Sequence, residues 1–303
     1  MRALALWLAL TVALPTVGHA EAFRFSVMMR VMEDSHDEPA MRAALESAQA
    51  SEPPFIVVNG LKRSDERCSE ALFQRRKGVL EQATVPVILS MAATDWADCR
   101  DRQKRTAARV WLNFLRDQFS GDIGSHSGGT LNIKHQSAMR AYRSYAENTR
   151  WVYQRILFAS LHVAANNNQY IEAAGQNQEF EDRQVANRKW IRRLADVALR
   201  ERLGAIVIFC DGNPLTATSL QSEARDGYRE VRRQLRELAE KTGLWVLVIQ
   251  GATVDAPNAS DAARSRPDII WRDRLGHVTL PIGVNWLTAD LNATLPFFLN
   301  SSE

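Results

Sequence analysis

The sequence predicts an α/β protein with a mostly parallel sheet and helices on its faces. Short apolar runs at 23–31, 55–58 and 85–89 alternate with helix-patterned segments at 39–50 and 69–82. Parallel strands need long crossover connections, usually helices, so this alternation favours parallel pairing over hairpins. Of the 303 residues, 46% are hydrophobic and 24% are charged. A chain of this size and composition can bury a full core, which excludes a disordered or collagen-like protein.

The middle of the chain interrupts the alternation between residues 100 and 150. A long helix is predicted over 102–119, with an apolar face made of Ala107, Val110, Trp111, Phe114 and Leu115. A loop rich in Gly and Ser over 120–134 and a second helix over 136–146 follow. We expect this helical excursion to leave the sheet, as a cap over a cleft would.

Regular alternation resumes after residue 150. The periodicity predicts strands over 156–164, 205–210 and 244–249, and helices over 179–202 and 222–241. Gly204 and Gly243 are expected to end these two helices, because glycine tolerates the left-handed backbone of a helix C-terminus. The tail is expected to form antiparallel strands over 269–272, 277–280 and 284–288, followed by a final apolar run. We predict a single domain over 21–303.

The N-terminus indicates export. Residues 1–20 have the three-part form of a secretory signal peptide: Arg2, an apolar run over 3–14, and small residues at Gly18 and Ala20 before the expected cut. The apolar run is shorter than the roughly 20 residues that span a bilayer, so no stable membrane insertion is expected after cleavage. The mature protein is predicted to be periplasmic or secreted.

The charge balance argues against nucleic acid as a partner. Lys and Arg total 38 against 35 Asp and Glu, a formal charge of +3. Nucleic-acid binders carry a strong basic excess on their contact surface. A periplasmic protein or a small anionic ligand is the expected kind of partner.

Export makes the cysteines informative, because an oxidising compartment permits disulfides. Cys68 and Cys99 lie in polar, loop-like sequence, whereas Cys210 ends an apolar run. We therefore predict a Cys68–Cys99 bridge and a buried free Cys210. The alternative is three free thiols, which exposure in an oxidising space disfavours.

Candidate ligand-binding residues follow the predicted strands, since ligands of open α/β sheets sit beyond the carboxyl ends of the strands. These residues are Arg30, Asp95, Asn166, Asn167, Asp211 and Asn213. Asn and Asp also favour turns, so the Asn166–Asn167 and Asp211–Asn213 segments could equally be turn residues. His162 lies inside a predicted apolar strand, which favours a hydrogen-bonded core histidine over a ligand.

The order and spacing of several segments resemble the calcineurin-like metallophosphoesterase superfamily, and in particular a bacterial exported branch. The segments are 23–25, 55–60, 64–69, 95–99, 147–151, 161–163, 166–167, 186–187 and Trp190. The resemblance spans most of the mature chain and implies a four-layer α/β/β/α sandwich of two packed sheets with helices outside. It also implies the Cys68–Cys99 bridge and two metal ions at the strand ends.

The chain departs from that family at the positions of the metal ligands. Arg30 stands where the first motif has an Asp, and Leu61 stands where the second motif has one. Thr94, preceded by Ala93, replaces the Asn-containing third motif, and the last motif at 251–254 has no His. Two divalent cations need several oxygen or imidazole ligands, and a guanidinium offers only donors. We therefore expect no catalytic residues, no metal ligands and no cofactor.

Three functions stay open at this point. The leading hypothesis is an exported phosphoesterase-fold protein without catalysis, acting as a binding or structural module. Arg30 could then receive an anionic group such as phosphate. The alternative is a hydrolase that holds two ions such as manganese or iron with a rearranged set, Asp34, His36, Asp95, Asp211 and Asp255. Asp34 and His36 lie four residues late for the first motif, where a solvated turn is the simpler interpretation. The third reading is an unrelated enzyme whose cleft holds a perturbed acid–base pair.

Overall fold

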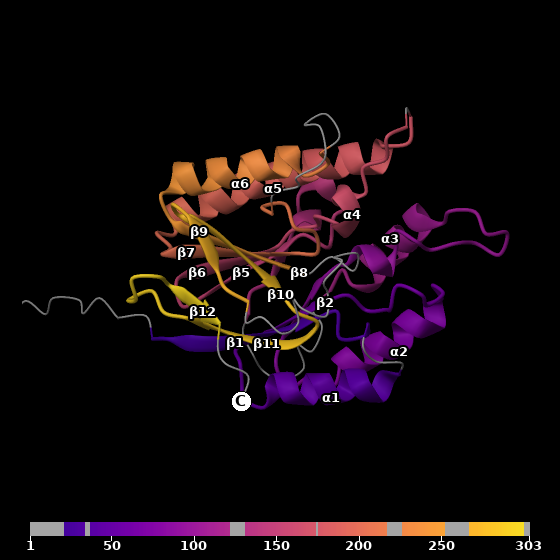
Figure 1. The fold of residues 1–303 in the computed structure, drawn as a ribbon, viewed down its shortest axis with the longest axis horizontal. Helices are drawn as coiled ribbons and strands as arrows, with labels where there is room; N and C mark the ends of the chain where they lie inside the picture. The colour runs from indigo at the N-terminus through magenta and orange to yellow at the C-terminus, as the bar shows by residue number, and fades with distance from the viewer. Residues whose placement is uncertain are drawn as a thin grey trace, which may run out of the picture.

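Two β-sheets form the centre of the molecule (Figure 1). The computed structural model describes residues 21–33, 37–121, 131–173, 175–216, 226–251 and 267–299. The predicted signal peptide lies outside these ranges. Within them, the first sheet has five strands in the order β12-β11-β1-β2-β3, and the second has seven in the order β4-β5-β6-β7-β8-β10-β9.

The first sheet is parallel in its β1-β2-β3 half, and β11 joins it antiparallel to β1. Its strands are β1 (Phe23–Met29), β2 (Ile56–Asn59), β3 (Val87–Ser90), β11 (Gly283–Ala289) and β12 (Phe297–Leu299). The first and the last parts of the chain therefore share one sheet.

The second sheet is built from the middle of the chain. Its strands are β4 (Lys134–His135), β5 (Thr149–Tyr153), β6 (Ile156–Ser160), β7 (Ala205–Cys210), β8 (Trp245–Gly251), β9 (Ile270–Arg272) and β10 (Leu275–Leu280). The strands β6, β7, β8 and β10 run parallel, while β4, β5 and β9 pair antiparallel with their neighbours. The expected antiparallel pairing of the tail is confirmed for β9 with β10 and for β11 with β12, but β10 also pairs parallel with β8, which the expectation did not include.

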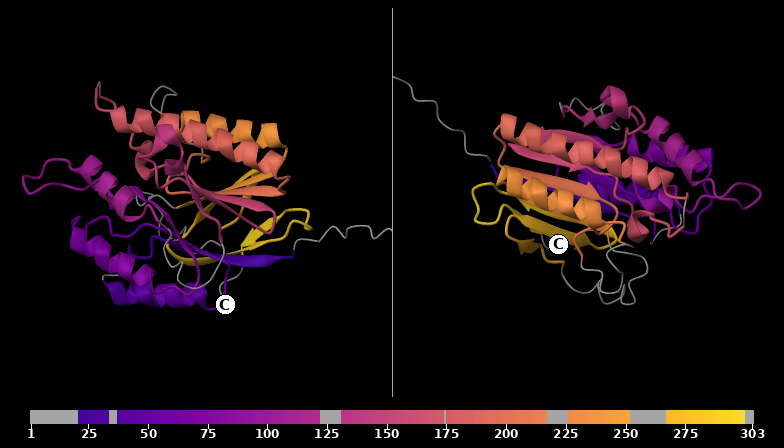
Figure 2. Two further views of the ribbon diagram at one scale, coloured as in Figure 1. Left: turned by 180° about the vertical axis from the view of Figure 1, so that it is seen from behind. Right: turned by 90° about the horizontal axis from the view of Figure 1, so that it is seen from above.

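Helices cover the outer faces of the two sheets (Figures 1 and 2). The helices are α1 (Glu38–Gln49), α2 (Glu70–Leu80), α3 (Ala108–Gln118), α4 (Ala165–Asn168), α5 (Gln178–Arg200) and α6 (Arg229–Thr242), with 3-10 turns at Ala93–Asp95, Gln136–Ala138 and Arg140–Tyr142. Apolar residues of α1, α2 and α3 pack on the first sheet, and those of α5 and α6 pack on the second. No helix in the described ranges is long and apolar enough to cross a membrane.

The space between the sheets is filled largely by aromatic rings. Phe25 stacks on Phe55 with ring centroids 5.5 Å apart, and Trp151 stacks on Phe158 at 5.6 Å. All four side chains are fully buried. Such pairs add about 0.5–1.5 kcal/mol each beyond the area they bury. This core fixes the two sheets against each other, and with them the loops at the strand ends.

The 100–150 segment differs from the predicted pair of helices. α3 begins at Ala108, six residues later than expected, because the Asp101 side chain accepts the backbone amides of Gln103 and Arg105 and holds a turn. Val110, expected on the apolar face, is 69% exposed. In place of a helix over 136–146 the chain forms two 3-10 turns, because the Gln136 side chain is buried and bonded to residues far along the chain.

The cysteine predictions are confirmed. Cys68 and Cys99 form a disulfide with their Cα atoms 5.6 Å apart, and Cys210 is a buried free thiol at the end of β7. Burial raises the pKa of the Cys210 thiol, so it stays protonated. The bridge ties the segment that follows β2 to the segment that follows β3.

Candidate functional site

Charged side chains gather where the carboxyl ends of β1, β2, β3 and β7 meet. The set, which we call the strand-end cluster, consists of Arg30, Lys62, Asp95 and Asp211, and each member is at most 3% exposed. Burying charges is costly unless they are paired and hydrogen-bonded. The partners of each member therefore show what the cluster does.

Arg30 joins the two sheets. It follows β1 of the first sheet, and its Nη2 donates to Oδ1 of Asp211, which follows β7 of the second sheet, at 2.7 Å. Burial lowers the pKa of Arg30, but the charge and hydrogen bond of Asp211 outweigh that effect and leave it raised. The guanidinium is therefore permanently charged.

The backbone around Arg30 is shaped to accommodate it. Arg30 has a φ of 43°, in the left-handed region that bulky residues rarely occupy. A side chain on Gly60 would lie 3.7 Å from the Arg30 Cγ, and one on Gly251 would lie 3.5 Å from its Nε. Both distances are ordinary van der Waals contacts, so these two positions border the Arg30 side chain closely without blocking it.

Asp211 also fastens two loops through its backbone contacts. Its Oδ2 accepts the amide of Ala93, which follows β3, at 2.8 Å. The same oxygen accepts the amide of Ala165, which follows β6, at 2.8 Å. One carboxylate thus holds the ends of strands from both sheets.

Asp95 has the same role within the first sheet. Its Oδ1 accepts the amides of Leu61 and Lys62 at 2.7 and 3.1 Å, and its Oδ2 accepts the amide of Ala92 at 3.1 Å. Burial raises the pKa of Asp95 to about 6, with Asp211 adding to the rise against the opposing amides and Lys62. Burial also lowers the pKa of Lys62, whose Nζ donates to the carbonyl of Arg63 at 2.7 Å.

These contacts do not suit a pair of metal ions. Every oxygen of Asp95 and Asp211 already accepts at least one N–H group, and a guanidinium lies against Asp211. Each carboxylate accepts three N–H groups, which take most of its roughly four lone-pair sites, and the fixed cation next to Asp211 repels a metal ion. Within the described ranges, no group of three or more His, Cys, Asp or Glu could hold a metal ion. Asp34, His36 and Asp255 of the rearranged set lie outside those ranges.

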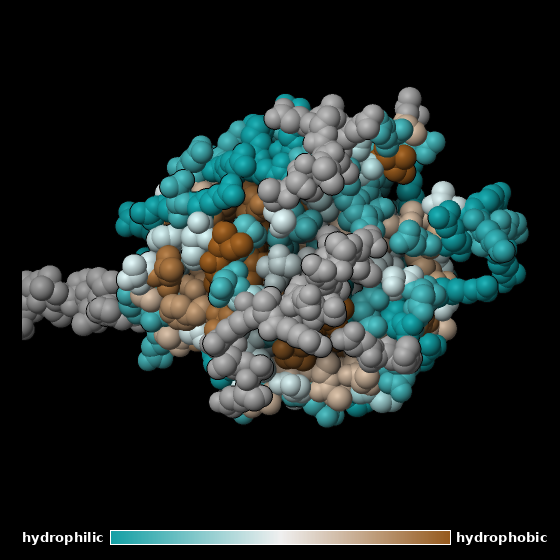
Figure 3. All heavy atoms as spheres, viewed as in Figure 1, coloured by the Kyte–Doolittle hydropathy of each residue, from teal (hydrophilic) through white to brown (hydrophobic). Residues whose placement is uncertain are grey.

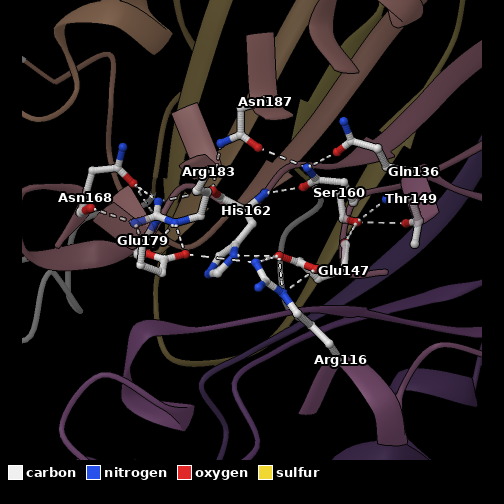
Figure 4. Close-up of polar contacts among 12 residues, drawn as sticks. Arg116, Gln136, Glu147, Thr149, Ser160, His162, Asn168, Glu179, Arg183 and Asn187 are labelled. Carbon is white, nitrogen blue, oxygen red and sulfur yellow. Dashed lines mark hydrogen bonds and ion pairs between the residues drawn. The ribbon is translucent and has the colours of Figure 1, made fainter. Parts of the chain in front are cut away.

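Figure 4 shows a second polar assembly, which is largely buried. We call it the Glu147 network. It consists of Arg116, Glu147, His162, Glu179 and Arg183, with the amides Gln136, Asn148, Asn168 and Asn187. Trp96, the neighbour of Asp95, packs its ring against His162 at 5.6 Å and under the Arg183 guanidinium at 6.0 Å, which places the two assemblies side by side.

Glu147 is the centre of this network. It accepts Nε and Nη2 of Arg116 from α3 at 3.0 and 2.6 Å, and its Oε1 lies 3.0 Å from Nδ1 of His162. Although burial raises the pKa of Glu147, Arg116 and His162 lower it to about 2. Arg183 from α5 bonds to Glu179 at 3.0 Å and to the side-chain and main-chain oxygens of Asn168.

His162 is buried, as the apolar pattern predicts, but it lies two residues beyond β6. Burial lowers its pKa, so the ring is neutral at pH 7. Its Nδ1 contacts Glu147, whereas its Nε2 has no hydrogen-bond partner in the described part of the chain. A Glu–His pair can activate a nucleophile that bonds to the second ring nitrogen. No described hydroxyl or thiol does so here.

The remaining candidate residues form turns. Asn166 to Gln169 all have positive φ values between 54° and 57°, one turn of left-handed backbone. Asn166 is exposed, while Asn167 Oδ1 accepts the amide of Gly227 at 2.8 Å. Asn213 is half-buried in the turn after β7, and its carbonyl accepts the amide of Thr216 at 3.3 Å. Ligand binding by this set stays a prediction.

The structure brings Arg30, Asp95 and Asp211 together, and it adds residues that sequence reasoning missed. Lys62, Arg116, Glu147 and Arg183 are buried ionic residues with no predicted role. The position of Lys62 directly after a predicted strand was the available signal. Arg183 lies on α5 among many other basic residues, and Arg116 shares α3 with Arg109, so nothing in the pattern distinguishes them. No family model and no curated protein sequence matches the chain.

Proposed function

We propose that the protein is an exported, non-catalytic binding or structural module with a metallophosphoesterase-like, four-layer α/β/β/α arrangement. In this proposal the strand-end cluster occupies the place of the family's two metal ions. Arg30 and Lys62 supply two positive charges, and Asp95 and Asp211 supply two negative charges. The side chains of Arg30 and Lys62 then provide the positive charge that two metal ions provide in that family.

The three N–H groups that each carboxylate already accepts are the observation that carries the proposal. Asp95 accepts three backbone amides, and Asp211 accepts two amides and one guanidinium. Removing a partner from a buried charge costs about 3–5 kcal/mol. A metal ion would have to displace several of these donors, and each would be left buried and unpaired.

The layer order supports the family-like arrangement. The outer helices, the two central sheets and the aromatic core between them occur in the sequence α1–α3, first sheet, second sheet, α5–α6 (Figure 2). The strand-end cluster lies at the carboxyl ends of strands from both sheets, where α/β proteins hold ligands. Fold does not by itself define function, so the chemistry of the cluster decides the proposal.

A direct test combines metal content with turnover. The full chain is exported, purified with added manganese, and analysed for bound manganese and iron. The same sample is assayed on bis(p-nitrophenyl) phosphate. We expect less than 0.1 metal ion per chain and no turnover above a heat-inactivated sample.

Two bound ions with turnover that a chelator abolishes would overturn the proposal in favour of the rearranged hydrolase. The variants Asp34→Asn and His36→Ala would then lose metal, whereas Asp37→Asn serves as the matched control. Asp37 is the N-cap of α1 and accepts the amide of Ala40, so it has a defined role without metal. Turnover that survives the chelator would instead indicate an unrelated metal-independent enzyme.

A further inference from the structure

The second sheet extends beyond the helices that cover it. α5 and α6 pack on β6, β7 and β8, α6 also contacts β10, and β9 continues the sheet beyond β10. One side of the β9–β10 hairpin therefore faces a groove beside α6 with no described helix over it.

This groove, the α6–β10 groove, has a volume of about 500 Å³. Its lining includes Arg236 and Glu240 of α6, with Arg272, Arg274, Leu275 and His277 of the β9–β10 hairpin. Alternate residues of β10 point into the two faces of the sheet: Val278 and Leu280 enter the core between the sheets, and Leu275 and His277 face the groove. A volume of this size suits a small organic ligand.

The groove combines an apolar base with unpaired positive charge. Leu215, Ala239 and Leu275 line it, and Figure 3 shows hydrophobic surface directly below the hydrophilic face of α6. Arg236, Arg272 and Arg274 have no ion pair within the described part of the chain, in contrast to Arg233 of the same helix, which bonds to Glu230 and Glu237.

Acidic residues do not cancel this charge. Glu240 and Asp273 also line the groove, so three guanidinium groups face two carboxylates. Arg274 lies over the Trp245 ring with 5.4 Å from its Cζ to the centroid, which limits its freedom while leaving its donors available. Guanidinium groups bind carboxylate and phosphate oxygens in a bidentate manner.

We propose that the α6–β10 groove binds a small organic anion whose apolar body lies on Leu215, Ala239 and Leu275 and whose carboxylate or phosphate group bonds to Arg236 and Arg272. No residue of the strand-end cluster lines this groove. The site is therefore independent of the proposed function, and either proposal can fail alone.

The test uses the full mature chain and isothermal titration with 2-naphthoate, an anion with a rigid apolar body. Two further probes separate the contributions: 2-naphthalenemethanol has the same body without the charge, and inorganic phosphate has charge without the body. We expect 2-naphthoate to bind at least tenfold more tightly than either one. Naphthyl phosphate in place of naphthoate tells whether the site prefers a phosphate or a carboxylate.

Arginine variants locate the binding. Arg272→Ala and Arg236→Ala are each expected to weaken 2-naphthoate binding about tenfold, the effect of one charge-assisted hydrogen-bonded contact. Arg192→Ala on α5 is the matched control, because it removes the same charge from another exposed position outside the groove and should change binding less than twofold. Thermal unfolding of each variant shows whether it folds.

Two results would overturn the proposal. One is no heat of binding for 2-naphthoate or naphthyl phosphate up to millimolar concentration. The other is binding that Arg236→Ala, Arg272→Ala and Arg192→Ala leave equally strong, because the anion would then bind elsewhere on the surface.

Discussion

The strand-end cluster and the Glu147 network each bury a carboxyl group, but the pKa values of the two groups shift in opposite directions. Asp95 and Glu147 are both almost inaccessible, at 0% and 7% exposure. Asp95 accepts backbone amides and lies near a second carboxylate, and its pKa is raised to about 6. Glu147 faces the Arg116 guanidinium and the His162 ring, and its pKa is lowered to about 2. Burial raises the pKa of both carboxyl groups. At Asp95 it outweighs the backbone amides and Lys62, whereas at Glu147 the charges and hydrogen bonds of Arg116 and His162 outweigh it.

The two assemblies also differ in what their carboxylates bind: backbone amides in one and side chains in the other. In the strand-end cluster the carboxylates hold loops, because backbone amides come from the turns after β2, β3 and β6. In the Glu147 network the carboxylates hold side chains that arrive from helices α3 and α5. Loss of the first kind should loosen the backbone, whereas loss of the second should leave unpaired cations in an otherwise intact frame.

Removing the Asp211 carboxylate should produce the largest effect. Asp211→Ala leaves the Arg30 guanidinium buried without its carboxylate and two amides without their acceptor. We expect a loss of about 5 kcal/mol in the free energy of unfolding, measured by urea denaturation. The double variant Arg30→Met/Asp211→Leu should recover part of that loss, since it removes the unpaired guanidinium, although the amides of Ala93 and Ala165 still lack their acceptor. A loss below about 1 kcal/mol for Asp211→Ala would mean that the pair does not clamp the sheets.

The Glu147 network should respond to acid. Because the pKa of Glu147 is about 2 when folded and 4.5 in its ordinary state, its stabilisation is present above pH 4.5 and is lost as the pH falls towards 2. We expect Glu147→Gln to cost about 3 kcal/mol at neutral pH and to lack this acid-dependent loss. Unfolding curves of both proteins between pH 2 and pH 7 measure the difference, which should shrink towards acid. A constant difference would contradict the lowered pKa.

Asp95 should respond with the opposite sign. A folded-state pKa of about 6, above the ordinary 3.8, means that the folded protein holds the proton more tightly. Its stabilising contribution is present below pH 4 and is lost as the pH rises through 6, by about 2–3 kcal/mol. The wild-type stability minus that of Asp95→Asn should therefore fall between pH 4 and pH 7. A difference that rises over this interval would place the Asp95 pKa below its ordinary value.

The smallest effect is expected at the left-handed turn. Asn166 is exposed and has a φ of 55°, a conformation that costs alanine more than asparagine or glycine. We expect Asn166→Ala to destabilise by about 1 kcal/mol and Asn166→Gly to be neutral or slightly stabilising. Comparison of the two midpoints in thermal unfolding separates backbone strain from side-chain contacts. Equal effects of Ala and Gly would mean that the turn is not strained.

Hydrophobic periodicity predicted most of the sheet and helix elements. The strand at 205–210 has the predicted bounds. All of its residues are apolar and buried, and Gly204 and Asp211 mark where the apolar run begins and ends. The helix over 136–146 failed because a single buried side chain, Gln136, bonds across to Asn148 and Ala186 and overrides local preference. The presence of two sheets came from the family resemblance and not from the alternation, which is equally consistent with one.

Some of the buried charged residues could likewise be predicted from the sequence, whereas their contacts could not. Arg30, Asp95 and Asp211 were found from their positions after predicted strands, since the carboxyl ends of parallel strands meet at one edge. Their pairing could not be predicted, because Arg30 and Asp211 are 181 residues apart and belong to different sheets. Arg116 and Glu147 are 31 residues apart and meet only in the folded structure, which no local pattern encodes.

The place of β11 beside β1 has a consequence for the order in which the molecule can assemble. β1 is the middle strand of the first sheet but is synthesised before its other described strands. Its partner β11 (Gly283–Ala289) is synthesised after the described strands of the second sheet. Until that segment emerges, one long side of β1 stays an open template for other strands. The second sheet lies wholly between these two segments and can form earlier. The β1–β11 pairing therefore closes a long loop that contains the whole described second sheet, so it is expected to form late.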